Sequence, residues 1–325
     1  MTADEPPGGR VAYLILAHRR PHQVAALAQR ITHLSPQSRI VVHWDARSGP
    51  FPAGVLPPTA AVVPNPVRGG WGRWSLVEAS LRMLAVARRE FQPRWSALIS
   101  GDDWPARDLA EWERELDEAG GDALIASSPV VDRRAAGESA VPLREDEVRR
   151  YRDSWLIVPP APFPFLNRVL RAIVRRIEPF ATRRPRGLAM MDFYDRGVAV
   201  SLGRSRLDPP LRVHKGAQWL TLGPRAVDAV LGADPRIVRH FRRTLIPDEA
   251  FIPSVVNAAP GLSVRAGLTS FAPWHAFHRS QLDLAVEDLA AIAASGAPFA
   301  RKLPSAPPNA VTAALDELAR RHERA

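Results

Sequence analysis

The chain contains no cysteine, which excludes disulfide bonds, thiolate metal ligands and a cysteine nucleophile. It also lacks any uninterrupted apolar run of about 18 residues, the length that a membrane-spanning helix requires, so we expect no integral membrane association. The N-terminus has neither the basic nor the apolar region of a secretory signal peptide, which favours a cytoplasmic protein. Acidic residues are outnumbered, with 34 Asp and Glu against 44 Lys and Arg.

The 325 residues are 46% apolar, which is enough for a large core in one large domain or two interlocked ones. The formal net charge is +10, and most of the basic residues are arginine. Because the planar guanidinium fork suits phosphate and carboxylate groups, we expect an anionic ligand. A nucleotide, an acidic lipid surface or an acidic acceptor all fit. No helix-turn-helix, zinc or RNA-recognition signature is present, so the sequence disfavours nucleic acid.

Strands and helices alternate over residues 11–127. The continuous apolar run Val11–Ala17 predicts a buried strand, and helical periodicity follows from Gln23. Ser75 is predicted to cap the next amphipathic helix, with Glu78 at capping-box spacing. The alternation predicts an α/β domain with a mostly parallel sheet covered on both faces. Further strands are predicted at residues 39–45, 61–64 and 95–100.

Polar residues follow three of these predicted strands: His18, Asp45, and Asp102 with Asp103. In open parallel sheets the ligand lies outside the carboxyl ends of the strands, so these residues are candidates for a nucleotide site. The alternative is that each aspartate serves only a turn or a helix cap.

Two adjacent carboxylates, Asp248 and Glu249, interrupt an apolar stretch directly after Pro247. Pro247 and Pro253 predict a fixed turn leading into a short helical segment. A carboxyl group with apolar neighbours has a raised pKa, which suits a general base near neutral pH. The pattern equally fits an Asp248 N-cap on a helix that begins at Glu249.

The remaining organisation divides the chain into unequal parts. Residues 1–10 are predicted to be disordered, and residues 11–303 form the main domain. Within it, 11–127 would be the nucleotide-sugar half, 128–212 an irregular insertion rich in Arg and Pro, and 213–303 the acceptor and catalytic half. The pattern predicts helices at about 166–177, at 224–231, and at 309–321 within the C-terminal segment 304–325, the last packing on the core.

Seven motifs occur in a fixed order: Ala12–His18 with Pro21, His43–Ser48, Arg68–Ala79, Leu98–Pro105, Gly216–Trp219, Leu245–Glu249 and Phe299–Lys302. In that order they resemble the core-2/I-branching β-1,6-N-acetylglucosaminyltransferases and the related peptide O-xylosyltransferases. The resemblance implies a GT-A-type nucleotide-diphosphate-sugar transferase fold, inversion at the anomeric carbon, and no cofactor or divalent metal. The middle segment 128–212 has little that aligns, so the acceptor is the least determined part.

The resemblance also implies roles for the acids and cations. Glu249 matches the general base that deprotonates the acceptor hydroxyl, and Asp248 would support it, although spacing alone permits the opposite assignment. Arg301 and Lys302 match the basic pair that stabilises the leaving diphosphate in place of a metal. A pair of solvated surface cations is the alternative.

Binding roles follow in the same way. Asp45 resembles the residue beside the uracil and ribose, with Arg47 and His18 as neighbours. Asp102 and Asp103 would lie on the substrate side; their Asp-Asp spacing differs from the metal-binding Asp-x-Asp motif. Three tryptophans could stack on a sugar or base or could equally belong to the core: Trp71, Trp74 and Trp219.

The resulting hypothesis is a UDP-sugar-dependent glycosyltransferase, with UDP-N-acetylglucosamine or UDP-xylose as the simplest donors. The acceptor would be a carbohydrate, a lipid-linked intermediate or a small molecule. The competing hypothesis is a catalytically silent nucleotide- or carbohydrate-binding protein of the same fold. Retention of Glu249, Arg301 and Lys302 together favours the enzyme.

Overall fold

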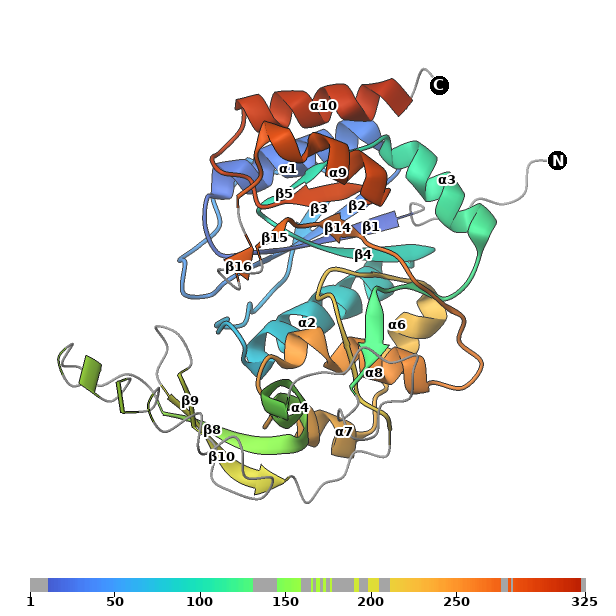
Figure 1. Ribbon diagram of the computed structural model, residues 1–325. Coiled ribbons are helices and arrows are strands. Elements are labelled where there is room, and N and C mark those ends of the chain that lie inside the picture. The colour runs from blue at the N-terminus through green and yellow to red at the C-terminus, as the bar shows by residue number, and fades with distance from the viewer. Residues whose placement is uncertain are drawn as a thin grey trace.

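A seven-stranded sheet forms the centre of the molecule (Figure 1). The computed structural model describes residues 11–130, 145–158, 165, 168–169, 172–173, 176, 190–192, 198–204, 211–275, 280–281 and 283–322. The strand order is β13-β6-β12-β4-β1-β2-β3, and within this sheet only β12 pairs antiparallel with its neighbours. The strands are β1 (Val11–Ala17), β2 (Arg39–Trp44), β3 (Ala60–Val62), β4 (Trp95–Ser100), β6 (Ala123–Leu124), β12 (Thr221–Leu222) and β13 (Val264–Arg265). The predicted α/β class with a mostly parallel sheet is confirmed.

The three central strands explain why their sequences are continuous apolar runs. On β1, Tyr13 and Ile15 face one apolar cluster while Ala12 and Leu14 face another, and all four are fully buried. A parallel sheet covered on both faces requires apolar side chains at every position. The register pairs Ala17 with Trp44 and places Ser100 beside Leu16, so β1, β2 and β4 end at one edge.

Helices cover both faces of this sheet (Figure 1). One layer contains α1 (Pro21–Leu34), α3 (Leu109–Ala119), α9 (Leu289–Ser295) and α10 (Ala310–His322). The other contains α2 (Trp74–Glu90), α6 (Pro224–Leu231), α7 (Pro235–Phe241) and α8 (Phe251–Ala258). The predicted packing of the C-terminal helix is confirmed, because Leu315 is fully buried and Asp316 accepts a hydrogen bond from Trp104 Nε1 at 2.9 Å.

Short strands and turns complete the fold around the sheet. A three-stranded sheet of order β14-β17-β5 consists of β14 (Ser270–Phe271), β17 (Phe299–Arg301) and β5 (Asp103–Pro105). A second, of order β8-β10-β9, consists of β8 (Asp153–Val158), β10 (Val198–Arg204) and β9 (Met190–Asp192). The remaining elements are β7 (Ser127–Pro129), β11 (His214–Gly216), β15 (Trp274–His275), β16 (Ser280–Gln281), α4 (Glu145–Arg152) and the 3₁₀ turns η2 (Pro247–Glu249) and η3 (Val286–Asp288).

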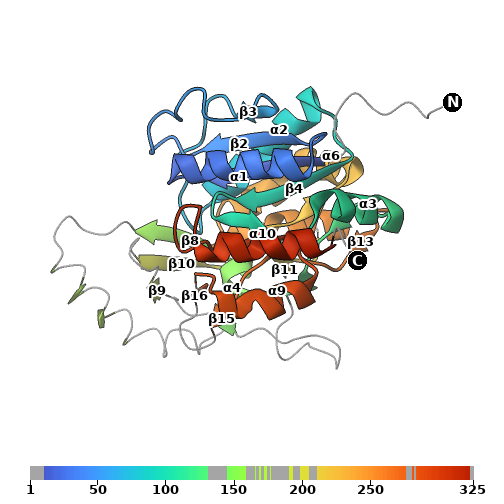
Figure 2. The ribbon, with the colours of Figure 1, turned by 90° about the horizontal axis from the view of Figure 1, so that it is seen from above.

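The sheet β8-β10-β9 lies at the edge of the molecule, away from the layer of α1 and α10 (Figures 1 and 2). Its connections include most of the predicted insertion and of the helix expected at 166–177, and many of those residues lie outside the described ones. So do residues 1–10. In the part of the chain that the structure describes, no helix is long and apolar enough to cross a membrane.

The predicted cap of α2 is wrong. The helix begins at Trp74, and its N-cap is Arg73 in an extended conformation without a side-chain cap. Ser75 is therefore inside the first turn, and Glu78 pairs with Arg82 at 2.7 Å instead of closing a capping box. Trp74 accounts for the earlier start, because its ring packs edge-on against Phe251 at 5.0 Å.

Candidate active site

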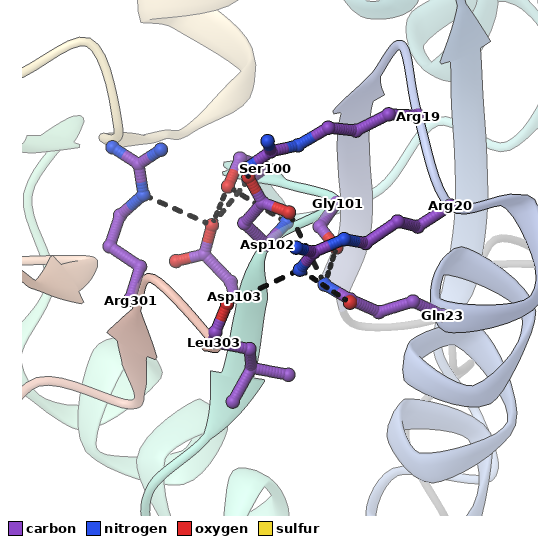
Figure 3. Close-up of polar contacts among 9 residues, drawn as sticks. All are labelled: Arg19, Arg20, Gln23, Ser100, Gly101, Asp102, Asp103, Arg301 and Leu303. Carbon is purple, nitrogen blue, oxygen red and sulfur yellow. Dashed lines mark hydrogen bonds and ion pairs between the residues drawn. The ribbon is translucent and has the colours of Figure 1, made fainter. Parts of the chain in front are cut away.

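Asp102 lies just beyond β4 and is held in place by two residues that follow β1 (Figure 3). Arg19 Nη2 donates to Asp102 Oδ2 at 2.7 Å, and Gln23 Nε2 donates to the Gly101 carbonyl at 2.8 Å. Gly101 must be a glycine, because a Cβ there would lie 2.9 Å from the Ala17 Cβ. The ends of β1 and β4 are thus joined by a charged contact.

Asp103 binds a different arginine. It opens β5, which pairs antiparallel with β17 so that Arg301 lies opposite Asp103, and Arg301 Nε is 3.6 Å from Asp103 Oδ2. Figure 3 shows Arg19 and Arg301 on opposite sides of the loop that carries the two aspartates. Asp103 is fully buried and also accepts hydrogen bonds from the Ser100 and Ser270 hydroxyls. Burial raises the pKa of Asp103, and Arg301 opposes this effect.

Arg301 is buried and Lys302 is partly buried. Arg301 is only 7% exposed, its guanidinium lies over the Trp219 ring at 4.7 Å, and Lys302 is partly buried. Burial lowers the pKa of Arg301, against the attraction of Asp103, and burial followed by repulsion from Arg301 lowers the pKa of Lys302. An anion bound beside these cations would relieve both effects. One face of Trp219 is covered by Arg301, so at most its other face remains for a sugar or base.

Asp45 follows β2, and both its oxygens are engaged. Oδ1 accepts from Arg47 N at 2.8 Å and Arg47 Nε at 3.2 Å, and Oδ2 accepts from Arg47 Nη2 at 2.9 Å and Gly69 N at 3.1 Å. Burial raises the pKa of Asp45, but the hydrogen bonds from Arg47 and Gly69 outweigh it, and the net pKa is lowered. Gly69 is required at this approach, because a Cβ would lie 2.6 Å from Asp45 Oδ2. His18 lies at the exposed end of β1, where its carbonyl accepts from Ser48.

The loop of residues 67–73 connects this aspartate to the acidic turn. Gly69 donates to Asp45, and three residues later the Gly72 carbonyl accepts from Ile246 N at 3.0 Å. Two motifs far apart in the sequence therefore meet beside the sheet edge. Trp71, in this loop, is 36% exposed. Trp74 is taken up by packing on Phe251 and by Arg242, whose guanidinium lies 5.6 Å from its ring centroid.

The acidic turn has the predicted form. Ile246 adopts a left-handed conformation with φ of 51°, η2 spans Pro247–Glu249, and α8 begins at Phe251. The helix-cap alternative for Asp248 is wrong, because the N-cap of α8 is Ala250 and no side chain caps it. Asp248 is instead directed into the protein, with Oδ1 buried and lacking a hydrogen-bond partner in the described residues. Burial and the neighbouring Glu249 raise the pKa of Asp248 to about 7.

Glu249 is less buried than Asp248 and faces a cluster of charged groups. Burial raises the pKa of Glu249, Lys215 and Arg150 lower it, and Glu147 raises it. Lys215 Nζ also pairs with Glu147 Oε1 at 3.1 Å. The buried Tyr151 hydroxyl lies near enough to lower the pKa of Glu249, although it forms no hydrogen bond of normal geometry in the described part of the chain. Lys215 and Arg150 therefore favour the ionised form of Glu249 against the effect of burial.

The predicted site residues fall into three groups: Asp102, Asp103, Trp219, Arg301 and Lys302; His18, Asp45 and Arg47; and Trp71, Asp248 and Glu249. The first two share the carboxyl edge of β1, β2 and β4, and the loop 67–73 links the second to the third.

Sequence reasoning missed Arg19, Lys215 and Tyr151. Arg19 follows a predicted strand and Lys215 precedes the motif at Gly216, so position could have suggested both. Tyr151 carried no signal, because α4 lies within the segment 128–212 that was expected to be irregular.

Comparison with known proteins identifies one family. Residues 11–136 match the family model for the Core-2/I-Branching enzyme, which confirms the resemblance over that part of the chain and implies glycosyltransferase activity. No curated protein matches the chain. Among solved structures, the mannose-1-phosphate geranyltransferase from Thermus thermophilus is similar at 11% identity and a TM-score of 0.29, over 79% of this chain and 73% of that one. That TM-score is too low to establish a shared fold.

Proposed function

We propose that this chain, which matches the Core-2/I-Branching enzyme family over residues 11–136, is an inverting glycosyltransferase that transfers a sugar from a UDP-sugar to an acceptor hydroxyl without a metal ion. N-acetylglucosamine and xylose are the sugars that the family resemblance favours. The observation that carries the proposal is the loop 67–73, which joins the strand-end residue Asp45 to the turn bearing Glu249. This loop would hold the proposed donor-side and acceptor-side groups in one fixed arrangement.

The proposed reaction is a single displacement. Glu249 accepts the proton of the acceptor hydroxyl as the acceptor oxygen bonds to the anomeric carbon, and the bond from that carbon to the diphosphate oxygen breaks. Attack from the face opposite the leaving group inverts the configuration. Glu249 is the better base of the pair, because it is more exposed than Asp248 and cations hold its charge. A protonated Asp248 beside it adds no second charge to the turn.

The leaving UDP carries away the bonding electrons and needs positive charge. Arg301 and Lys302 would supply it from a desolvated position, where a preorganised cation is more effective than in water. Asp103 and Trp219 fix the orientation of Arg301. Asp102 and Asp103 each contact an arginine, an arrangement that serves to position these cations.

A donor screen tests the proposal. Hydrolysis of a panel of nucleotide sugars should release UDP from a uridine donor, and the rate should be unchanged by EDTA. Complete loss of turnover in EDTA that Mn²⁺ restores would contradict the metal-free mechanism. UDP binding without turnover of any donor, even with a panel of acceptors, would instead support the silent binding protein.

A further inference from the structure

A buried histidine on β2 contacts the first residue of the loop 67–73. His43 is 1% exposed, and its side chain lies on the same face of the sheet as that of Val41, which packs in the apolar cluster of α2. Val67 N donates a hydrogen bond to His43 Nε2 at 2.9 Å. A ring nitrogen that accepts a hydrogen bond carries no proton, so His43 is neutral, with its proton on Nδ1. The contact therefore requires one protonation state of the ring.

The surroundings of His43 disfavour a second proton. Its Nδ1 atom is buried and forms no hydrogen bond of normal geometry in the part of the chain that the structure describes. Asp45 follows the same strand, and Arg82, on α2, pairs with Glu78 at 2.7 Å and donates to the Asn65 carbonyl. Burial lowers the pKa of His43, Asp45 and the carbonyl of His43 itself raise it, Arg82 lowers it, and the net shift is downward. The ring is therefore neutral at neutral pH.

The other contacts at this end of the loop do not change in the same pH range. The Val67 carbonyl accepts from Ala46 N at 3.2 Å, and two residues later Gly69 N donates to Asp45 Oδ2 at 3.1 Å. The first is a backbone contact, and the pKa of Asp45 is lowered, so this carboxylate stays charged in mild acid. The bond to His43 is the one among these three that a proton would break near pH 6.

Protonation of His43 would oppose two hydrogen-bond donors. Nε2 would then carry a proton that faces Val67 N–H, and neither group can accept from the other. A positive charge would also be buried. Because the folded pKa of His43 lies below its ordinary value of about 6.5, the attached loop binds fewer protons than the released loop. The attached state is therefore fully favoured above about pH 6.5 and loses stability as the pH falls through the folded pKa.

We propose that His43 is a positioning residue, whose neutral imidazole holds the loop 67–73 at the end of β2 and whose protonation in mild acid releases the loop. Release moves the Gly69 amide away from Asp45, so the nucleotide loses part of its binding surface. The contact itself stands on the hydrogen bonds alone, whereas the loss of nucleotide affinity rests on the proposed function.

Nitrogen-15 NMR and amide hydrogen exchange of the wild type test the contact. We expect the tautomer with the proton on Nδ1 at about pH 7.5, and protected Val67 and Gly69 amides. After correction for the intrinsic effect of pH on exchange, protection should fall about three- to tenfold by about pH 5.5, the range for one hydrogen bond. A proton on Nε2 at about pH 7.5, or protection that does not depend on pH, would overturn the proposal.

Two substitutions separate an acceptor from a residue that only fills space. His43→Gln places an amide oxygen near the position of Nε2 and accepts at every pH, so protection should be retained and its dependence on pH abolished. His43→Met has a similar size but no comparable acceptor, and its protection should be low at both pH values. His33→Gln, on the exposed end of α1, is the control and should behave like the wild type. Equal protection in the Gln and Met variants would overturn the proposal.

Calorimetry with UDP measures the consequence for binding. Between about pH 7.5 and 5.5, the wild type should lose about three- to tenfold more affinity than His43→Gln, and the titration of UDP itself is common to both. Exchange that follows the proposal while both proteins show the same pH profile of UDP affinity would overturn the effect on the nucleotide. No UDP binding to the wild type at either pH would contradict the proposed function, and hydrogen exchange would still decide the role of His43.

Discussion

Two buried aspartates, Asp45 and Asp248, have almost the same exposure but opposite pKa shifts. Asp45 is 5% exposed and Asp248 is 8% exposed. Asp45 accepts four hydrogen bonds, from Arg47 and Gly69, which lower its pKa despite burial. Burial, followed by the neighbouring carboxylate of Glu249, raises the pKa of Asp248 to about 7, and Asp248 Oδ1 has no hydrogen-bond partner among the described residues. Asp248 lies deeper than Asp45, so both the depth of burial and the donors that the fold supplies determine the ionisation of these two carboxyl groups.

This difference in hydrogen-bond donors distinguishes the ends of the strands from the acidic turn. At the strand ends, arginines contact Asp45, Asp102 and Asp103, and the proposed function assigns this region to the nucleotide. At the acidic turn, no arginine in the described part of the chain pairs with Asp248, and burial raises the pKa of the neighbouring Glu249. Under the proposed function, the first region would bind the donor and the second would carry the general base.

The largest expected effect comes from Glu249→Gln, which keeps the shape of the side chain but cannot accept a proton. Transfer to the true acceptor should fall by roughly 10² to 10⁴-fold, the range for a positioned general base. UDP affinity, measured by calorimetry, should be retained. Asp248→Asn is the matched control and should reduce transfer less. If Asp248→Asn abolishes transfer while Glu249→Gln does not, the two roles are reversed.

Asp248→Asn should change how stability depends on pH. An acid whose folded pKa of about 7 exceeds its unfolded value binds more protons when folded, so wild-type stability declines as pH rises from about 4 to 7. Removing this titration should raise the stability of the variant, relative to wild type, by as much as about 4 kcal/mol between those pH values. Urea denaturation of both proteins at several pH values measures this difference in the free energy of unfolding.

Asp45→Asn should change the pH dependence of stability in the opposite direction. The pKa of Asp45 is depressed, so its stabilising contribution is present above the unfolded pKa and is lost as pH falls through the folded one. The variant should therefore be destabilised most near neutral pH and least in acid. Equal pH profiles for the two variants would remove the distinction between the two aspartates.

Substitutions of Arg301 and Lys302 should have a smaller effect, which is on UDP affinity. Lys302→Ala and Arg301→Lys should each weaken UDP binding by about 1.5 to 3 kcal/mol, roughly tenfold or more, because each loses a charge-assisted phosphate contact. Arg301→Lys is preferred to Arg301→Ala, since it leaves a cation beside the buried Asp103. Arg89→Ala, on an exposed face, is the control. Unchanged UDP affinity in both folded variants would show that these cations do not hold the diphosphate.

The sequence was sufficient for the central sheet because its signals are local. The apolar run Val11–Ala17 needs both faces covered, and Pro224 starts the predicted helix that ends at Leu231. The positions of Asp45 and Asp102 directly after predicted parallel strands also anticipated that they would share an edge. In contrast, the cap of α2 was misplaced because Trp74 packs on Phe251, a contact between residues far apart in the chain.

Contacts between distant segments explain the rest of what the sequence could not provide. The pairing of β5 with β17 brings Arg301 to Asp103, and no local pattern encodes that register. The same holds for Tyr151 and Lys215 beside Glu249. The sequence Asp248-Glu249 likewise did not show which of the two carboxyl groups is buried. The directions of both side chains follow from the backbone of the turn, which is left-handed at Ile246.

A titration of the individual carboxyl groups tests the assignment of the base most directly. Carbon-13 NMR of wild type, with Glu249→Gln and Asp248→Asn to assign the signals, follows each side chain through neutral pH. We predict that Glu249 loses its proton at a lower pH than Asp248, whose midpoint lies near 7, so that Glu249 carries the charge of the turn. Ionisation of Asp248 before Glu249, or a neutral Glu249 at pH values where transfer is fastest, would contradict the account.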